Sequence, residues 1–204
     1  FQNETLTSNG YDDAFMIKYD ANGNELWSKN FGGTNLAPGE GGSAHADNTG
    51  NFIISVGRFW GTMTVDGNTI TSSGQSDIFV AKFDLNGNCI WLRSAGSRGI
   101  DIGGEFAFDS NNNIFITGSV SDTAQFDSFT VTPGNFFAKY DINGNCLMAQ
   151  QKYSGINITD IKRMSNSFIL CGYLSGTTVT LDTITVTSTQ SSVVLGKVDN
   201  NGNA

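Results

Sequence analysis

Four short segments of the sequence carry aspartate and asparagine at an alternate spacing that resembles a calcium-binding loop. Each reads Asp-x-Asn-Gly-Asn, at residues 20–24, 84–88, 141–145 and 199–203. In EF-hand loops, oxygens at alternate positions coordinate Ca²⁺, but here the glycine comes too early and no glutamate follows at a fixed distance. The same residues suit a tight turn, in which Asp and Asn accept local backbone hydrogen bonds and Gly takes a positive φ. We therefore interpret the segments as hairpin turns and expect no metal and no cofactor.

Residues that could perform acid–base or nucleophilic catalysis are few. His45 is the only histidine, and its counterparts in the repeats described below are Ala107 and Ile161. No serine or cysteine forms a recognisable triad with it. No pair of carboxylates recurs at corresponding positions, as glycosidase chemistry would need. We therefore expect no enzyme activity.

The Asp-x-Asn-Gly-Asn segments belong to longer repeats, and these define the architecture. Residues 77–91 read as an apolar run, a polar turn and a second apolar run, which is the pattern of a β-hairpin. The pattern recurs around four lysines that lie 64, 57 and 58 residues apart: Lys18, Lys82, Lys139 and Lys197. A period of this size indicates a repeat protein. A lysine present once per repeat indicates a structural role, with its stem over Trp27, Trp91 or Met148.

Each complete repeat is predicted to hold four main strands, with a Thr-rich excursion between the second and the third. In the first complete repeat the strands are A (42–47), B (51–57), C (77–84) and D (88–94). Four antiparallel strands in about 57–64 residues match one four-stranded blade of an all-β propeller. A β-solenoid, with shorter coils and parallel strands, is the alternative.

The repeat boundaries divide the chain into four parts of one propeller domain. They are the second half of one blade (1–30), two complete blades (31–94 and 95–152) and a truncated blade (153–204). The strand count is too low for a closed ring, so we expect a piece of a longer protein. The remaining blades would come from the same chain or from a neighbouring one.

The composition excludes some partners. The net charge is −8, with 11 Lys and Arg against 19 Asp and Glu, so binding to a phosphate backbone is not expected. No segment is long and apolar enough to span a membrane. The three cysteines lie outside zinc-binding spacings. They suit small apolar positions on buried strands, although a Cys146–Cys171 bridge between neighbouring repeats is an open alternative.

Several segments resemble the SBBP-type β-propeller repeats of bacterial secreted and cell-surface proteins. The resemblance rests on residues 77–88, on 50–57, on 69–74, and on the Gly-Gly pairs at 32–33 and 103–104. It implies an extracellular or cell-surface location, often in large multidomain proteins of Bacteroidetes-like bacteria. Many such proteins are exported by type 9 secretion and act as adhesins or scaffolds. The family offers no catalytic motif to carry over.

A ligand site is expected where the repeats differ. The A–B and C–D turns are short and alike, whereas the B–C and D–A connections are long and variable, and binding residues concentrate on such loops. Aromatic residues and arginines are common interface anchors. The candidates for binding a protein or a glycan are Arg58, Phe59, Trp60, Arg98, Asp101, Asp122 and Tyr173. Alternatively, Phe59 and Trp60 only pack the excursion onto its blade.

Two other functions stay open at this point. One is a structural role in a secretion or gliding-motility assembly. The other is a propeller lyase or glycan hydrolase with its site in the central channel. The A strands offer His45, Asp47, Glu105, Asp109 and Arg163 for that chemistry. These residues occupy unlike positions in their repeats, so the first interpretation, a non-enzymatic binding module, is preferred.

Overall fold

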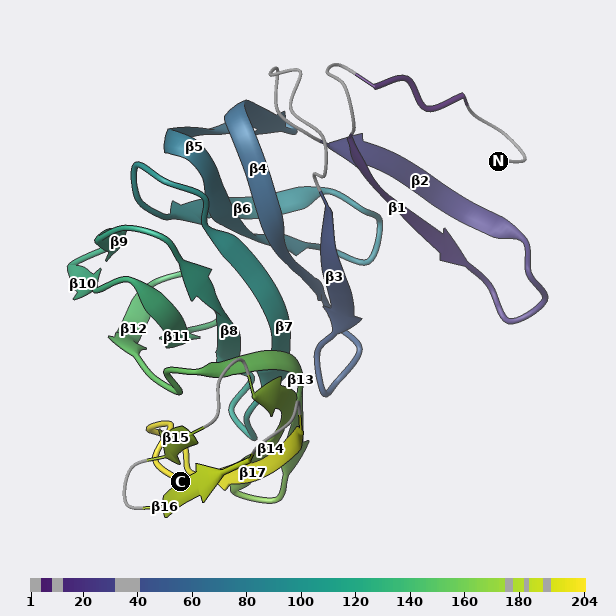
Figure 1. The fold of residues 1–204 in the computed structure, drawn as a ribbon. Coiled ribbons are helices and arrows are strands. Elements are labelled where there is room, and N and C mark those ends of the chain that lie inside the picture. Colours follow the sequence, from purple (N-terminus) through teal and green to yellow (C-terminus); the bar gives the residue numbers. More distant parts are fainter. Residues whose placement is uncertain (1–4, 9–12, 32–40, 175–177, 182–183, 189–191) are drawn as a thin grey trace.

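The structure is a computed structural model that describes residues 5–8, 13–31, 41–174, 178–181, 184–188 and 192–204. These residues form strands and turns, and they contain no helix (Figure 1). The ladders between strands are antiparallel throughout. The prediction of an all-β protein is therefore confirmed. The solenoid alternative, which requires parallel strands, finds no support in these ladders.

Two four-stranded sheets form the centre of the molecule, and their strands pair in chain order. The first contains β3 (Gly41–Ala46), β4 (Ile53–Val65), β5 (Asn68–Phe83) and β6 (Cys89–Ala95). The second contains β7 (Ile102–Phe108), β8 (Ile114–Val120), β11 (Gly134–Tyr140) and β12 (Cys146–Gln151). They match the predicted strands A to D of the two complete repeats.

Smaller sheets flank the two central ones. One contains β1 (Ala14–Tyr19) and β2 (Glu25–Phe31). The other contains β13 (Ile156–Met164), β14 (Ser167–Leu174) and β17 (Val193–Val198). Two hairpins stand apart from the sheets, formed by β9 (Ala124–Phe126) with β10 (Phe129–Val131) and by β15 (Thr178–Leu181) with β16 (Ile184–Thr187).

The B–C connection differs from one repeat to the next. Residues 58–76, expected to be a loop with a Thr-rich excursion, are mostly strand, because β4 and β5 continue past the sheet as one long hairpin. Its tip is Asp66-Gly67, where both residues have positive φ, as a two-residue hairpin turn requires. In the next repeat the excursion is the separate β9–β10 hairpin. Strand β13 also begins at Ile156, inside the stretch expected to be a D–A loop.

Successive sheets pack face to face through the two sides of each C strand. On β5, the side chains of Phe79, Ala81 and Phe83 form one face, which packs toward β1 and β2. Ile78 and Val80 point to the other face and pack against residues of β7, β8 and β11. This alternation follows from the two-residue period of a strand. It confirms the prediction that the Phe-Ala-Phe face meets a neighbouring repeat.

The Asp-x-Asn-Gly-Asn segments are hairpin turns, as predicted. In the segment at 84–88, one carboxylate oxygen of Asp84 accepts hydrogen bonds from the backbone N–H groups of Asn86 and Asn88, both at 2.8 Å. The other oxygen accepts a bond from the Asn88 side chain at 2.8 Å. The bonds from the Asn88 side chain and backbone lower the pKa of Asp84. All four copies share this arrangement, so the recurring oxygens are already occupied by the protein.

The turns at 84–88 and 141–145 also receive side chains from the preceding repeat. The indole N–H of Trp91 and the ammonium of Lys82 both donate to the carbonyl oxygen of Ile142, at 3.1 and 3.2 Å. The Trp91 ring lies against Gly144 of the same turn. We call this contact the turn clasp. Trp27 and Lys18 hold the carbonyl of Leu85 in the same way, at 2.9 and 2.8 Å.

The turn clasp differs at the last turn, residues 199–203, and the lysine ammonium groups lie elsewhere than predicted. Met148 replaces the tryptophan there, and the hydroxyl of Tyr153 donates to the carbonyl oxygen of Gly202 at 2.7 Å. The lysine stems were expected to lie over Trp27, Trp91 or Met148 of a D strand, with the ammonium groups in water. Lys18, Lys82 and Lys139 do stand directly opposite these residues. The ammonium of Lys82, however, lies 4.1 Å from the ring centroid of Phe52, and that of Lys139 lies 4.9 Å from the ring of Phe115.

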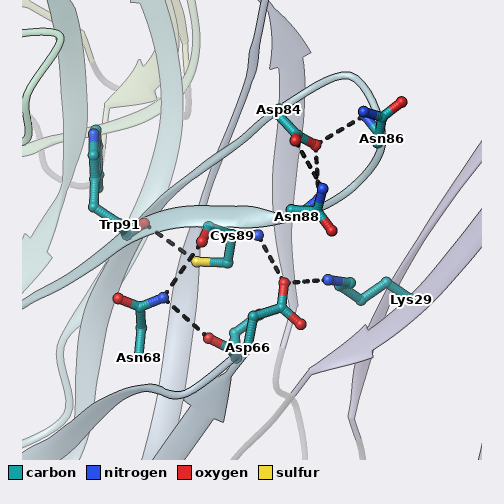
Figure 2. A network of polar contacts seen from close by, with 9 residues as sticks. Lys29, Asp66, Asn68, Asp84, Asn86, Asn88, Cys89 and Trp91 are labelled. Carbon is teal, nitrogen blue, oxygen red and sulfur yellow. Dashed lines mark hydrogen bonds and ion pairs between the residues drawn. The ribbon is translucent and has the colours of Figure 1, made fainter.

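The tip of the long β4–β5 hairpin folds back onto β6, the outer strand of its sheet (Figure 2). The carboxylate of Asp66 accepts a bond from the backbone N–H of Cys89 at 2.7 Å and another from Lys29 of the preceding sheet. In the next repeat, Asp127 accepts a bond from the N–H of Cys146 at 2.8 Å. Since an outer strand presents unpaired backbone groups, the excursions occupy some of them.

Candidate functional site

The predicted ligand-binding residues lie at the end of the sheets opposite the Asp-x-Asn-Gly-Asn turns. We call this region the long-loop edge. It consists of residues 58–60 of β4 and the ends of β8 and β14, together with the connections at 96–101 and 121–123. The register places it, because Arg58 on β4 is opposite both Gly41, where the A strand begins, and Ile78. Ile78 in turn is opposite Ala95, where the D strand ends.

Arg58 and Trp60 share one face of β4, and Phe59 points to the other. The guanidinium carbon of Arg58 lies 4.7 Å from the ring centroid of Trp60, close enough for a cation–π contact. Both side chains are half-buried. Phe59 is fully buried, with 0 % of its surface exposed, among Phe79, Met63 and neighbouring core residues. The prediction that Phe59 contacts a ligand is wrong, because no surface of it is accessible.

The repeats contain a signal that would have identified Phe59 as a core residue. Each B strand contains a glycine at the same repeat position, namely Gly57, Gly118 and Gly172. Two positions after this glycine stand Phe59, Val120 and Leu174, which are all buried. One position after it stand Arg58, Ser119 and Tyr173, which differ in chemistry and are at least partly exposed. The position that varies, and not the apolar one that follows, faces the solvent.

Asp101 is also a structural residue. It is fully buried, with 0 % of its surface exposed. Its carboxylate accepts hydrogen bonds from the hydroxyl of Ser97 at 2.9 Å, from the N–H of Ser121 at 3.0 Å and from the N–H of Ser97. These bonds join the connection at 96–101 to the segment that follows β8. The prediction that Asp101 binds a ligand is therefore wrong, because its oxygens are buried and occupied.

Arg98 and Asp122 lie on the two connections that Asp101 joins. Both side chains are exposed. The backbone carbonyl of Arg98 accepts a bond from the N–H of Gln75 at 3.4 Å, which ties this loop to the long β4–β5 hairpin. The carboxylate of Asp122 accepts a bond from the N–H of Thr123 at 2.7 Å. Arg98 and Asp122 thus present opposite charges on neighbouring segments, whose backbones are joined by the hydrogen bonds of Asp101.

Tyr173 lies in a different sheet from the other candidates. It stands on β14, opposite Asn157 of β13, and 44 % of its surface is exposed. Its hydroxyl accepts a bond from the Asn157 side chain at 2.5 Å. At this edge, a cavity of about 200 Å³ lies between the repeats 95–152 and 153–204. Its lining includes Ser119, Asn135 and Asn157. Tyr173 therefore belongs to a second part of the long-loop edge, on the sheet of β13, β14 and β17.

Asp77 is a carboxylate at this edge that the sequence analysis did not select. It is 1 % exposed, and it accepts a bond from the N–H of Ser73 at 3.0 Å, while its second oxygen has no partner. Burial, and secondarily the charge of Asp101, raise its pKa. No repeat pattern predicts this, because the equivalent residues are Asp13, Gly134 and Ser192.

The polar residues of the A strands do not assemble into one cluster. His45 and Glu105 face each other across β3 and β7, with 3.7 Å between His45 Nε2 and Glu105 Oε2. Asp47 is buried in its turn and accepts bonds from Thr49, Asn51 and Phe52. Asp109 caps its own turn in the same way. Among the described residues, no group of three or more His, Cys, Asp or Glu could hold a metal ion.

The environment of Cys89 and Cys146 disfavours their thiolate forms. All three are free thiols, so the Cys146–Cys171 bridge does not form. Burial raises the pKa of Cys89 to about 11 and that of Cys146 to about 12. Since the thiolate is the nucleophile, neither residue is suited to catalysis at neutral pH.

Comparison with curated proteins finds a local match. No protein-family model matches the sequence. A stretch of 55 residues, 27% of the chain, is 38% identical to an uncharacterized WD repeat-containing protein of Acanthamoeba polyphaga mimivirus. The matched stretch spans only 4% of that protein. In the part of the chain that the structure describes, no helix is long and apolar enough to cross a membrane.

Proposed function

We propose that the chain forms part of a β-propeller whose long-loop edge binds a protein or a glycan outside the cell. Three features support the propeller. The repeats form four-stranded antiparallel sheets in chain order, these sheets pack face to face, and the chain has local similarity to a WD repeat-containing protein. WD repeats build propeller blades of four strands each. The binding role is argued from the edge itself.

The observation that carries the binding role is variation on a constant scaffold. In the three repeats with a described B strand, the position after the glycine is paired with the C strand in the same way, yet it presents Arg58, Ser119 or Tyr173. A rigid scaffold with variable side chains at one edge is the usual form of a binding surface. Trp60 and Arg98 add an aromatic ring and a positive charge to this edge, and both residue types are common interface anchors.

The resemblance of the segments named above to SBBP-type repeats supports a proposal for the location and the class of protein. We propose a secreted or cell-surface module of adhesin type, exported by the type 9 route, with a scaffold role in a larger protein. A non-enzymatic role is preferred because Asp47 and Asp109 are engaged within their own turns. His45 and Glu105 face each other, and no group of three or more His, Cys, Asp or Glu in the described residues could hold a metal ion.

A binding experiment tests this proposal. The chain is applied to an array of immobilised glycans and of fibronectin and collagen, together with Trp60→Ala and Arg98→Ala. Ile90→Ala serves as a matched control, since Ile90 is exposed on β6. We expect the two edge variants to lose at least tenfold in affinity, which is about 1.4 kcal/mol, while the control keeps it. Unchanged binding by both edge variants would contradict the proposal.

A further inference from the structure

At the long-loop edge, the junction between the repeats 31–94 and 95–152 holds two buried carboxylates, those of Asp77 and Asp101. The connection at 96–101 is bound to the C strand of its own repeat. The N–H of Asp101 donates to the carbonyl oxygen of Ser76 at 2.9 Å, and the Ser76 hydroxyl donates to the carbonyl oxygen of Asp101 at 3.2 Å. Side chains and a long connection thus occupy this junction.

The next junction lacks these side chains. Gly134 stands at the repeat position of Asp77, and Gly155, like Asp101, directly precedes its A strand. The connection between β12 and β13 is also shorter than the one between β6 and β7. The cavity of about 200 Å³ lies here, between the repeats 95–152 and 153–204. It therefore coincides with the loss of two carboxylates and a shorter connection.

The cavity has two walls that are held at a fixed separation. One wall is the cross-strand pair of Ser119 on β8 and Asn135 on β11, whose side chains lie on the same face of the sheet. The other wall is the segment 154–156. The side-chain amide of Asn135 donates across the junction to the carbonyl oxygen of Tyr153 at 2.9 Å and to that of Ile156. The cavity is thereby preformed.

The pair that forms the first wall differs between repeats. The equivalent pairs are Arg58 with Ile78, and Tyr173 with Val193. Of the three pairs, only Ser119 with Asn135 combines two neutral polar side chains. Since variable residues on a constant scaffold determine what such an edge binds, this part of the long-loop edge is suited to a neutral polar ligand.

The polar groups of both walls have unused hydrogen-bonding capacity. Among the described residues, the hydroxyls of Ser119 and Ser154 and the side-chain oxygen of Asn135 make no hydrogen bond. A hydroxyl can donate and accept, and an amide oxygen accepts. None of the described lining residues is ionisable, so a charged ligand would lose its hydration without gaining a counter-charge, which is costly.

We propose that this cavity binds one neutral monosaccharide unit of a glycan. Sugar hydroxyls donate and accept, as the groups of Ser119, Ser154 and Asn135 require, and the C–H groups of the ring suit the apolar side chain of Ile156. The cavity is larger than a single water needs and smaller than the about 300–1,000 Å³ of pockets for drug-sized ligands, which suits one sugar ring. The inference rests on the glycan binding proposed for the long-loop edge.

Saturation-transfer difference NMR with the full chain tests the chemistry of the site. The probes are glucose, galactose and mannose, each paired with its uronate, which has the same ring and one carboxylate. We expect at least one neutral sugar to bind saturably, with a dissociation constant in the millimolar range, and its uronate to bind at least tenfold more weakly. Failure of all the neutral sugars to bind, or equal or tighter binding of the uronate, would overturn the proposal.

Variants locate the bound sugar. Ser119→Tyr fills the cavity with a side chain that the fold accepts at the equivalent position, Tyr173, and should weaken binding at least tenfold. Ser154→Phe blocks the opposite wall from an exposed position and replaces Ser119→Tyr if that variant does not fold. Ser110→Tyr, in an exposed turn at the other end of β8, is the matched control and should bind normally. Unchanged binding by a folded blocking variant, or equal loss in the control, would overturn the proposal.

This inference and the proposed function can fail separately. The array experiment with Trp60→Ala and Arg98→Ala tests the part of the edge around those residues, whereas Ser119→Tyr tests the cavity. If Trp60→Ala abolished monosaccharide binding while Ser119→Tyr left it unchanged, the sugar would bind near Trp60. That result would overturn the inference and leave the proposed function intact.

Discussion

The turn clasp makes a quantitative prediction for glycines that share a conformation but differ in their surroundings. Gly144 has a φ of +83°, and a Cβ added to it would meet the Trp91 ring at 3.0 Å. Gly50 also has a positive φ, +69°, but nothing lies within 4 Å of its Cβ position. Replacing either glycine by alanine imposes the same kind of backbone strain. Only Gly144→Ala also displaces the ring that joins two sheets.

The expected difference follows from the contacts. A left-handed alanine costs roughly 1–2 kcal/mol in either variant. Moving the Trp91 ring weakens its hydrogen bond to Ile142, worth about 0.5–1.5 kcal/mol, and opens contacts of the ring with the turn. We therefore expect Gly144→Ala to lose about 1–2 kcal/mol more than Gly50→Ala, from the hydrogen bond and a share of the ring packing. For a chain of this size, each kcal/mol lowers Tm by about 2–4 °C.

Thermal unfolding followed by far-ultraviolet circular dichroism measures this difference. Gly144→Ala should melt at a clearly lower temperature than Gly50→Ala. Trp91→Phe provides a second comparison, because it keeps an aromatic ring against Gly144 but removes the N–H donor. Trp91→Phe should lower Tm by less than Gly144→Ala does. If Gly144→Ala and Gly50→Ala melt together, the ring contact contributes nothing measurable and the reasoning fails.

Two further predictions concern buried ionisable groups. The pKa of Asp77 is raised by burial in the folded state, so its contribution to stability is present below the unfolded pKa and is lost as the pH rises through the folded one. Asp77→Asn should therefore raise Tm more at pH 7 than at pH 4, and an equal change at both would contradict a raised pKa. Cys89 and Cys146, with pKa values raised to about 11 and about 12, should react slowly with iodoacetamide at pH 8 and rapidly once urea unfolds the chain. Rapid labelling of the folded protein would show that burial does not suppress their thiolates.

Much of the sheet architecture was predictable because the same pattern of strands and turns occurs in several copies along the sequence. Strands of period two, bounded by Asp-Asn-Gly turns, occur in register around Lys82 and Lys139, so each copy supported the interpretation of the other. The two faces of the C strand followed from the alternation of Phe79, Ala81 and Phe83 with their neighbours. The turn bonds of Asp84 followed from the side-chain types alone.

The candidate site was predictable only in outline. The long-loop edge was located from the variation between repeats, but two of its proposed residues were buried. Phe59 belongs to an apolar position that recurs as Val120 and Leu174, so comparing copies at the right offset would have excluded it. Asp101 has no aspartate counterpart in the other repeats, and Asp77 has one only in Asp13. The burial of both depends on how the connection at 96–101 lies against the β4–β5 hairpin. That contact is tertiary and leaves no local pattern.

The turn clasp has a consequence for how such a chain can evolve. Each repeat supplies both partners of the clasp. In the repeat at 31–94, Trp91 and Lys82 donate to the turn of the next repeat, and the turn at 84–88 accepts from Trp27 of the preceding repeat. A gene segment that encodes one repeat therefore encodes both halves of the joint. A tandem duplication would add a sheet that fits its new neighbours at once. Whole repeats can be gained or lost in this way, while the side chains of each copy are free to diverge at the long-loop edge.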